Sequence, residues 1–461
     1  MKKEEIVKTD TIASVATPAG EGAIGIVRLS GDESSLILKK VFRPGKTIKR
    51  YINHKMYYGT IIDKTGQPID QVMIAFMKAP GTYTGEDMLE VYTHGGSGIV
   101  NAVLQTVIDT GARLAQRGEF TRRAFLNGKM DLLQSEAVVD LVKADTDAAR
   151  KQAINQITGK LSQFVSSIKG KLVQVKENIE VQIDFPEDDV TPKQLFDLKV
   201  ILQVAYDEVK HVLETYDQAK IIRHGISIAL VGRPNAGKSS LFNIMLGENR
   251  AIVTSYPGTT RDYIEESTSY KGVKLILIDT AGLRNSEEPV EKMGIEMTQA
   301  QIKRADIIAV VIDPTIEHSY EEELGIVKEY NDKAILVINK IDITEAKKVE
   351  QVKQIFHYHP VYAVSAKTKE GIEALKQGIT APSHAPSIEN TPVINRYRHK
   401  QVLEHTELVL KAAINLIDEQ AFPEIIAEEI DSAILALKDL TGEVTTEDIL
   451  DRIFSEFCIG K

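Results

Sequence analysis

Residues 232–239 read GRPNAGKS and lie between an apolar run, ISIALV at 226–231, and a helical pattern, SLFNIML at 240–246. A strand, this glycine-rich motif and a helix in that order predict a phosphate-binding loop. The glycines let backbone N–H groups turn towards phosphates at a helix N-terminus, where the helix dipole favours negative charge. We expect Lys238 to reach the β- and γ-phosphate oxygens and the Ser239 hydroxyl to bind Mg²⁺.

Four further motifs follow the phosphate-binding loop in the order that a guanine-nucleotide site needs. PGTTRD at 257–262 offers a Thr that can complete the Mg²⁺ shell, and DTAG at 279–282 ends the apolar run KLILI. An Asp at that strand end can hold a magnesium-bound water, and a Gly N–H can meet the γ-phosphate. The sequence therefore predicts a P-loop nucleotide hydrolase.

The choice of base follows from NKID at 339–342, which ends the apolar run AILVI. The carboxylate of Asp342 can accept hydrogen bonds from both N1–H and the 2-amino group of guanine, a donor pair that adenine lacks. Ser365, Ala366 and Lys367 follow VYAV and place backbone amides near the guanine O6. We therefore expect GTP to be the substrate.

Water activation is not explained by the residue after DTAG. Ras-like GTPases orient the attacking water with a Gln there, whereas this chain has Leu283. Glu287, Glu288 and Glu291 in the stretch 284–291 are candidates for this role, and a solvated acidic loop is the alternative for each.

The remaining pattern predicts a multidomain α/β and α protein. Apolar strands at 226–231, 274–278, 307–312, 334–338 and 361–364 alternate with amphipathic helices, which predicts a parallel, doubly wound sheet in a domain at 221–382. Residues 1–124 mix β-rich runs with Gly and Pro, as in an α+β domain. We expect helices at 125–220 and 383–461 to form one helical domain into which the GTPase domain is inserted; two separate helical domains are the alternative.

Two apolar stripes support the helical prediction. Their steps of three and four residues place each stripe on one helix face, and Pro186 is expected to end the first helix. The first stripe comprises Leu161, Val165, Ile168, Leu172, Val175, Ile179 and Ile183, and the second comprises Leu195, Leu198, Leu202, Ala205, Val209, Val212 and Tyr216.

Composition bears on the binding partners and on the cellular compartment of the protein. The formal net charge of −10 argues against broad, non-specific polyanion binding, so RNA would need a local basic patch. The single cysteine, Cys458, rules out an intrachain disulfide and favours a reducing cytoplasm. We expect no secretory signal in the first residues and no membrane span, because no apolar run reaches 18 residues.

Long motifs across the chain resemble the MnmE (TrmE) family of bacterial tRNA-modification GTPases. They are TPAGEGAIGIVRLSG at 17–31, YTGEDMLEVYTHGG at 83–96, GEFTRRAFLNGKMDL at 118–132, GRPNAGKSS at 232–240, AIVTSYPGTTRD at 251–262, DTAGLR at 279–284 and the terminal FCIGK. The resemblance implies a homodimer that works with the FAD-dependent protein MnmG, in a heterotetramer, on the wobble uridine of certain tRNAs. It implies addition of an aminomethyl or carboxymethylaminomethyl group at C5, with a one-carbon unit from 5-formyl- or methylene-tetrahydrofolate, and K⁺-dependent dimerisation of the GTPase domains that activates hydrolysis.

The resemblance also assigns residues. It implies K⁺ ligands at Asn235, Thr254, Tyr256 and Thr259, Mg²⁺ ligands at Ser239 and Thr260, a general base at Glu291, and folate contacts at Arg28, Glu90, Lys129 and Lys461. The full set implied for GTP is Asn235, Ala236, Gly237, Lys238, Ser239, Ser240, Thr254, Ser255, Tyr256, Pro257, Gly258, Thr259, Thr260, Asp279, Thr280, Ala281, Gly282, Asn339, Lys340, Asp342, Ser365, Ala366 and Lys367.

General chemistry agrees with these roles. A K⁺ ion between phosphates can neutralise developing charge as an arginine finger does, and a Glu acting through water suits the apolar Leu283. The folate set has weaker support, since Arg28 on an apolar strand can equally be a packing or surface residue. Cys458 can be a small buried hydrophobe or a thiol that takes part in the modification.

Two other classes of protein compete with this reading. A ribosome-assembly GTPase, acting as an RNA-binding switch, shares the P-loop and the Leu after DTAG, but the C-terminal segment EEIDSAILALKDLTGEV at 428–444 is acidic and helical, with no GxxG loop. A scaffold with a vestigial site is opposed by the intact Lys238, Ser239, Thr260, Asp279 and Asp342.

Overall fold

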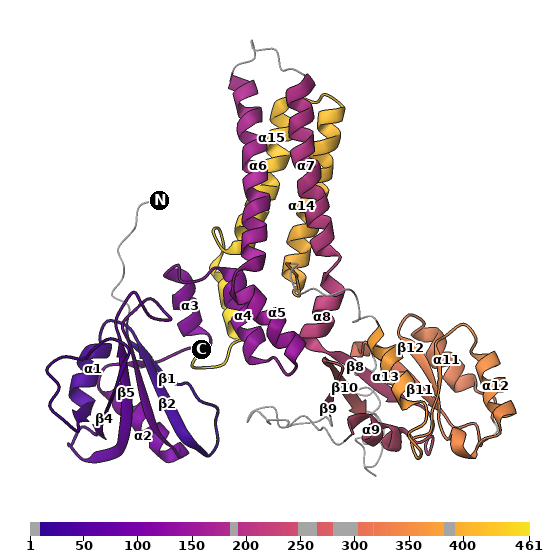
Figure 1. Ribbon diagram of the computed structural model, residues 1–461, viewed down its shortest axis with the longest axis horizontal. Helices are drawn as coiled ribbons and strands as arrows, with labels where there is room; N and C mark the ends of the chain where they lie inside the picture. Colours follow the sequence, from indigo (N-terminus) through magenta and orange to yellow (C-terminus); the bar gives the residue numbers. More distant parts are fainter. Residues whose placement is uncertain (1–9, 185–191, 248–264, 280–302, 317, 382–391) are drawn as a thin grey trace. The chain divides into compact units, whose positions relative to one another are not determined.

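The computed structural model describes residues 10–184, 192–247, 265–279, 303–316, 318–381 and 392–461 (Figure 1). The chain divides into two compact units. The first comprises Met1–Val142, Asn155–Tyr206 and His405–Lys461, and the second comprises Lys143–Ile154 and Asp207–Glu404. No helix in these described ranges is long and apolar enough to cross a membrane.

The N-terminal part of the first unit is a seven-stranded sheet in the order β3-β4-β5-β6-β2-β1-β7. Neighbouring strands are antiparallel except β1 and β7. The strands are β1 (Ile12–Val15), β2 (Gly22–Ser30), β3 (Phe42–Pro44), β4 (Lys55–Ile62), β5 (Pro68–Met77), β6 (Met88–Gly95) and β7 (Arg113–Leu114). Helices α1 (Ser34–Val41) and α2 (Ser97–Asp109) follow β2 and β6, and α3 (Glu119–Leu126) follows β7.

Strand alternation places successive side chains of this sheet on opposite faces. Val27, Leu29, Leu89 and Val91 point into the core that α1 and α2 cover. The residues between them therefore lie on the opposite face of β2 and β6. The antiparallel register pairs Arg28 with Glu90 on that face.

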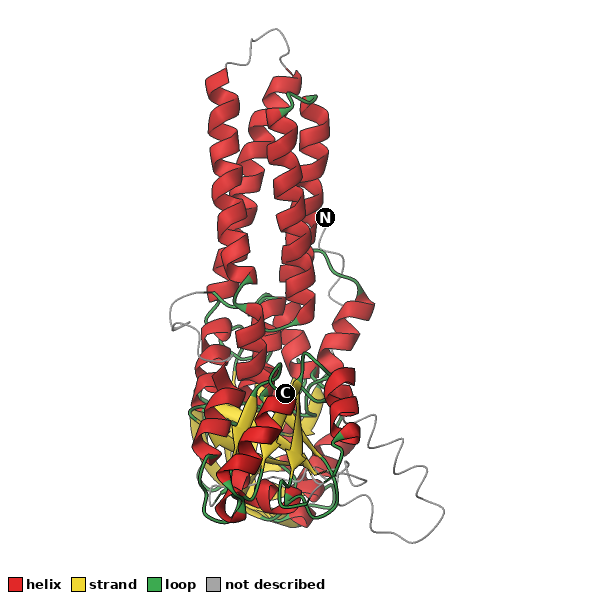
Figure 2. Cartoon of the chain, turned by 90° about the vertical axis from the view of Figure 1, so that its right-hand side faces the viewer, coloured by secondary structure: helices red, strands yellow, loops and turns green. Residues whose placement is uncertain are grey.

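The helical part of the first unit is built from segments on both sides of the GTPase domain. Its long helices, red in Figure 2, run alongside one another in both views. Ion pairs join the segments: Lys176 Nζ lies 2.6 Å from Asp431 Oδ1, and Lys199 Nζ lies 2.6 Å from Asp418 Oδ1. The helices are α4 (Leu132–Val142), α6 (Lys160–Asp184), α15 (Pro423–Thr441) and α16 (Glu447–Ser455), with the larger part of α7 (Pro192–Leu213) and of α14 (Tyr397–Asp418). Most of α5 (Asp147–Ile157) belongs to the second unit.

The insertion of the GTPase domain into one helical domain is thus confirmed, and the alternative of two helical domains is wrong. The first predicted stripe lies on α6, with Leu161 to Ile179 buried and Ile183 half-buried. The second stripe needs a correction, because α7 ends at Leu213 and Tyr216 begins a separate helix, α8 (Tyr216–His224). The Thr215 hydroxyl donates to the Val212 carbonyl at the junction.

The GTPase domain in the second unit has a six-stranded sheet in the order β13-β12-β11-β8-β10-β9. Its strands are β8 (Ile226–Val231), β9 (Glu265–Tyr270), β10 (Val273–Asp279), β11 (Ile307–Ile312), β12 (Ala334–Ile338) and β13 (Val361–Ala363). Helices α9 (Lys238–Leu246) and α13 (Ile372–Thr380) pack on one face, and α11 (Glu321–Glu329) and α12 (Ala346–Ile355) pack on the other.

The predicted parallel, doubly wound sheet is confirmed for β8, β10, β11, β12 and β13. The sheet also has an edge strand that the sequence analysis did not predict, because β9 pairs antiparallel with β10. Its sequence, EESTSY, lacks apolar alternation, and as an edge strand it needs little apolar surface.

Candidate functional sites

The phosphate-binding loop, between β8 and α9, has a glycine with positive φ at each end. Gly232 has φ +140°, and a Cβ there would lie 2.3 Å from the Val311 carbonyl oxygen. Gly237 has φ +92°, and a Cβ there would lie 2.2 Å from Asn339 Nδ2. No larger side chain fits at either position without a shift of its neighbours.

Lys238 and Ser239 stand on the first turn of α9, where the helix dipole favours an anion. The Lys238 ammonium lies inside the loop and donates to the carbonyls of Gly232 at 2.9 Å and Arg233 at 2.8 Å. Ser239 is exposed beside it. This arrangement fits a phosphate with a magnesium ion, which is what the sequence predicts for these two side chains.

Asn339 joins the three loops predicted to bind the nucleotide. Its side chain is 1% exposed, so both ends need hydrogen-bond partners. The amide nitrogen donates to the Ala236 carbonyl at 3.0 Å, and the amide oxygen accepts from the Ala366 N–H at 3.0 Å. Phosphate-binding, NKID and SAK loops are thereby held in one arrangement.

Asp342, which is predicted to read the base, is oriented by its neighbour Ser365. Ser365 is buried, and its hydroxyl donates to Asp342 Oδ1 at 2.7 Å, while Asp342 itself is exposed. The two predicted loops are therefore in direct contact, as a shared guanine site requires. Lys367 is also exposed at this end of the sheet.

Asp313, which the sequence analysis missed, holds Lys340 of the NKID loop. Lys340 Nζ lies 2.6 Å from Asp313 Oδ2, and Lys340 has a positive φ of 62°. Burial alone would raise the pKa of the Asp313 carboxyl, but hydrogen bonds from Lys340 and Thr315 outweigh it and lower the pKa. The signal available in the sequence was an Asp directly after the apolar strand β11.

Several predicted nucleotide residues lie outside the described residues: Thr254, Ser255, Tyr256, Pro257, Gly258, Thr259, Thr260, Thr280, Ala281, Gly282 and Glu291. Asp279 is described as the last residue of β10, where it pairs with Leu230 of β8. Within the described ranges no three His, Cys, Asp or Glu side chains are grouped as a metal site. Asn235, predicted to bind K⁺, is exposed and has φ +63°.

A second candidate site lies on the face of the N-terminal sheet that bears Arg28 and Glu90, where Phe120 of α3 also packs. Arg28 Nε donates to Glu90 Oε1 at 2.8 Å, and the Tyr92 hydroxyl donates to Glu90 Oε2 at 2.6 Å. Burial and the neighbouring Glu90 raise the pKa of Tyr92 to about 12, so this hydroxyl stays a donor. The Arg28 guanidinium lies 5.9 Å from the centre of the Phe120 ring.

The C-terminal tail reaches the same site. Arg28 Nη1 donates to the Gly460 carbonyl at 3.3 Å, and Ile459 forms an antiparallel bridge with Arg117. Burial lowers the pKa of the Lys461 ammonium, and the charge of Arg28 lowers it further. Predicted folate residues from both ends of the chain, Arg28 and Lys461, are thus close in space.

Cys458 and Lys129 complete the predicted set. Cys458 is half-buried, and its carbonyl accepts from the Lys461 N–H at 3.3 Å. Lys129 follows α3, and its side chain contacts the loop at 80–85, where Nζ donates to the Pro80 carbonyl at 2.9 Å. Tyr83 of that loop is half-buried; desolvation raises its pKa, while a hydrogen bond with Thr121 and the charge of Arg28 act in the opposite direction. Tyr83 and Tyr92 are residues of this site that the sequence analysis missed.

Comparison with known proteins gives matches along the whole chain. The family model described as "GTP-binding protein TrmE N-terminus" matches residues 11–129, and the one described as "MnmE helical domain" matches residues 132–458. Proteins named "tRNA modification GTPase MnmE" from Natranaerobius thermophilus and Syntrophus aciditrophicus are 40% and 42% identical, each over 98% of this chain and 99% of the relative.

A solved structure of the G domain of the T. maritima FeoB iron transporter is 31% identical and covers 34% of this chain and 97% of that chain, with a TM-score of 0.27. At that TM-score the likeness adds nothing to the argument.

Proposed function

The chain belongs to the MnmE family of tRNA modification GTPases, and from that premise we propose that it couples GTP hydrolysis to one-carbon chemistry at C5 of the wobble uridine of tRNA. The product carries an aminomethyl or carboxymethylaminomethyl group, and the FAD-dependent protein MnmG is the partner. The family assignment covers the full length, so a ribosome-assembly switch does not fit this chain.

The observation that carries the proposal is the hydrogen bond between Arg28 and the Gly460 carbonyl, which ties the C-terminal tail to strand β2 of the N-terminal sheet. Glu90 and the Phe120 ring fix the guanidinium from two other directions. A folate has a carboxylate tail, and a fixed guanidinium is a suitable partner for such an anion. Lys461 beside Arg28 adds a second cation, whose lowered pKa an anion would raise again.

A bound tetrahydrofolate derivative supplies the one-carbon unit in this proposal. The residues that hold it are Arg28, Glu90 and Lys461. Lys129, whose side chain contacts the loop at 80–85, is the fourth. Cys458 lies three residues from Lys461 on the same tail, close enough for its thiolate to affect the Lys461 pKa. A role of the thiol in the modification stays open beside a packing role.

The nucleotide site drives the cycle. Lys238 and the α9 N-terminus bind the phosphates, Ser239 and Thr260 hold Mg²⁺, and Asp342 reads the base. Asn235, with the loop at 254–259, binds K⁺, and Glu291 acts as general base through water. K⁺ and GTP bring the GTPase domains of a homodimer together, and that contact activates hydrolysis. We keep the domain boundaries at 124, 220 and 382 as part of this proposal.

Reconstitution tests the proposal. Purified chain, an MnmG protein, unmodified tRNA, GTP, K⁺ and methylene-tetrahydrofolate with a labelled one-carbon unit should place the label on the wobble uridine. Arg28→Gln should abolish labelling and leave GTP turnover unchanged. Arg43→Gln is the matched control, because the Arg43 guanidinium contacts only carbonyls of residues 39, 40 and 42 among the described contacts. Labelling at the wild-type rate by the Arg28 variant would contradict the folate site.

A further inference from the structure

The phosphate-binding loop has a side chain that the nucleotide motifs do not explain. Arg233 follows Gly232, and its own carbonyl accepts from Lys238 Nζ at 2.8 Å. Its guanidinium extends to α11, where Nε lies 3.1 Å from Glu323 Oε1 and 3.4 Å from Glu322 Oε2. The Nε atom makes no hydrogen bond among the described residues, so the contact is an ion pair. Through it Arg233 connects the loop around Lys238 to the first turn of α11.

The two glutamates differ in their surroundings. The Glu322 side chain is 70% exposed, whereas that of Glu323 is 3% exposed. An exposed ion pair contributes little, because water competes for both charges. A buried carboxylate is costly without partners, and Glu323 Oε2 meets no hydrogen-bond donor among the described residues. Glu323 therefore depends on the partners of its other oxygen.

His318 is the second partner of Glu323. Its Nε2 lies 3.1 Å from Glu323 Oε1, and its Nδ1 lies 3.0 Å from the Ile316 carbonyl. Both neighbours are acceptors, so both contacts are hydrogen bonds only when each ring nitrogen carries a proton. His318 and Arg233 are therefore the two partners of the buried Glu323 carboxylate among the described residues.

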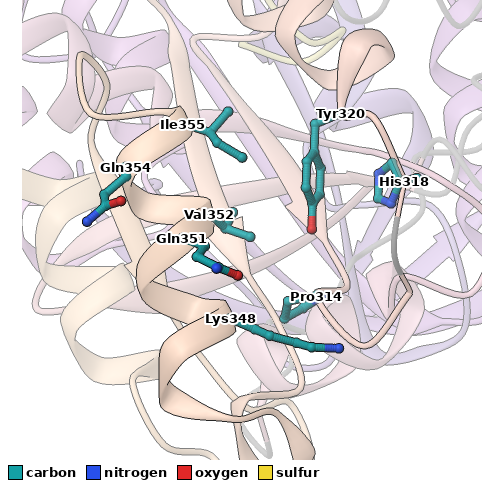
Figure 3. A pocket seen from close by; sticks show the side chains of 8 residues that line it. All are labelled: Pro314, His318, Tyr320, Lys348, Gln351, Val352, Gln354 and Ile355. Atoms are coloured by element: carbon teal, nitrogen blue, oxygen red, sulfur yellow. The ribbon is translucent and has the colours of Figure 1, made fainter.

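Aromatic packing fixes the position of His318. Its ring centre lies 4.2 Å from that of Tyr320, and the Tyr320 ring meets Phe356 edge-on at 6.3 Å. Figure 3 shows His318 and Tyr320 on one side of a groove of about 520 Å³, with residues of α12 on the other side. His318 lies in the segment between β11 and α11, and Asp313 at the start of that segment binds Lys340 of the NKID loop. His318 thus packs on Tyr320, which in turn packs on Phe356 at the end of α12.

We propose that Glu323, held by His318, is a positioning residue for GTP and GDP binding. It fixes the Arg233 side chain, and through the Arg233 backbone it fixes the loop that surrounds Lys238. Arg233 is the residue of the phosphate-binding loop that Glu323 contacts, so the effect of Glu323 passes through Arg233. Because the loop binds substrate and transition state alike, we expect the effect in affinity and KM, with kcat little changed.

The test is the dissociation constant of a fluorescent GDP analogue for the full-length protein. Glu323→Gln keeps the shape and removes the charge, and should weaken binding about tenfold, equivalent to about 1.4 kcal/mol. Glu322→Gln is the matched control, with the same chemistry one residue away, and should change binding less than twofold. KM for GTP should rise with Glu323→Gln by a similar factor.

A double-mutant cycle separates a role through Arg233 from a general structural effect. Arg233→Gln alone should also weaken GDP binding about tenfold, and the double variant with Glu323→Gln should be no weaker than that. A product of the two effects, near 100-fold, would overturn the proposal, as would equal effects of the Glu322 and Glu323 variants. Should Glu323→Gln fail to fold, His318→Gln combined with Arg233→Gln gives the same cycle, with non-additive loss expected and additive loss contradicting the proposal.

Discussion

Replacing Gly460 with Ala should disconnect the C-terminal tail from the N-terminal sheet. Gly460 is buried, has φ +96°, and a Cβ there would lie 2.4 Å from the Val15 carbonyl oxygen and 3.2 Å from Ala16 Cα. Both neighbours are backbone atoms, so no flexible side chain can move to make room. The tail itself must shift.

The size of the effect follows from two costs. A non-glycine residue at this φ costs about 1–3 kcal/mol, and overpacking against the backbone costs about 1–3 kcal/mol more. The opposing hydrogen bond from the charged Arg28 contributes about 1.5–3 kcal/mol. A deficit of about 2 kcal/mol lowers the ratio of seated to unseated tail roughly 30-fold. Phe454 and Phe457 keep their buried positions, so the domain should stay folded.

The assay measures wobble-uridine modification and GTP turnover for the same preparation. Gly460→Ala should lower the modified-uridine yield more than tenfold, leave GTP turnover within twofold, and shift the melting temperature by only a few degrees. Gly20→Ala is the matched control, because Gly20 has φ +125° with nothing within 4 Å of a Cβ. Wild-type yield with Gly460→Ala, or equal loss with both variants, would refute the link between tail seating and chemistry.

Four further predictions follow from the proposed roles. GTP turnover should be much faster in KCl than in NaCl at matched ionic strength, and equal rates would remove the K⁺ site at Asn235. Asp342→Asn should favour xanthosine over guanosine nucleotides, because xanthine offers a carbonyl to the amide; an unchanged GTP preference in competition binding would contradict it. Glu291→Ala should bind GTP normally and lower kcat, so an unaltered kcat returns the role to Glu287, Glu288 or neither. Deleting residues 458–461 should abolish modification and spare K⁺-stimulated hydrolysis. Cys458→Ser should abolish modification, with folate still bound, only if the thiol takes part in the modification chemistry.

The GTPase sheet could be predicted strand by strand because buried parallel strands are continuous apolar runs, as in ISIALV and AILVI. The polar edge strand β9 has no such pattern and was missed. The boundary between α7 and α8 was missed for a similar reason, because Tyr216 continues the apolar spacing although a new helix begins there. Local periodicity does not report where the chain turns between two helices.

The site residues also divide into those that a local motif predicts and those that only the fold brings together. Asp342 and Ser365 were predicted from motifs, and the structure brings them within hydrogen-bond distance. The contact of Tyr92 with Glu90 depends on strand register and could not be found from the sequence. Asp313 has a sequence signal in its place directly after β11, but its partner Lys340 is brought close only by a loop contact. The pairing of Arg28 with Gly460 spans 432 positions, and no local pattern predicts such a contact.

Nucleoside mass spectrometry of total tRNA measures directly whether this chain supports modification of wobble uridines. A strain without the gene should lack the aminomethyl-type modification at C5, and a plasmid copy of the wild-type gene should restore it. The Gly460→Ala gene should fail to restore it, although its product accumulates and hydrolyses GTP. The same content of modified uridine with and without the gene would contradict the account.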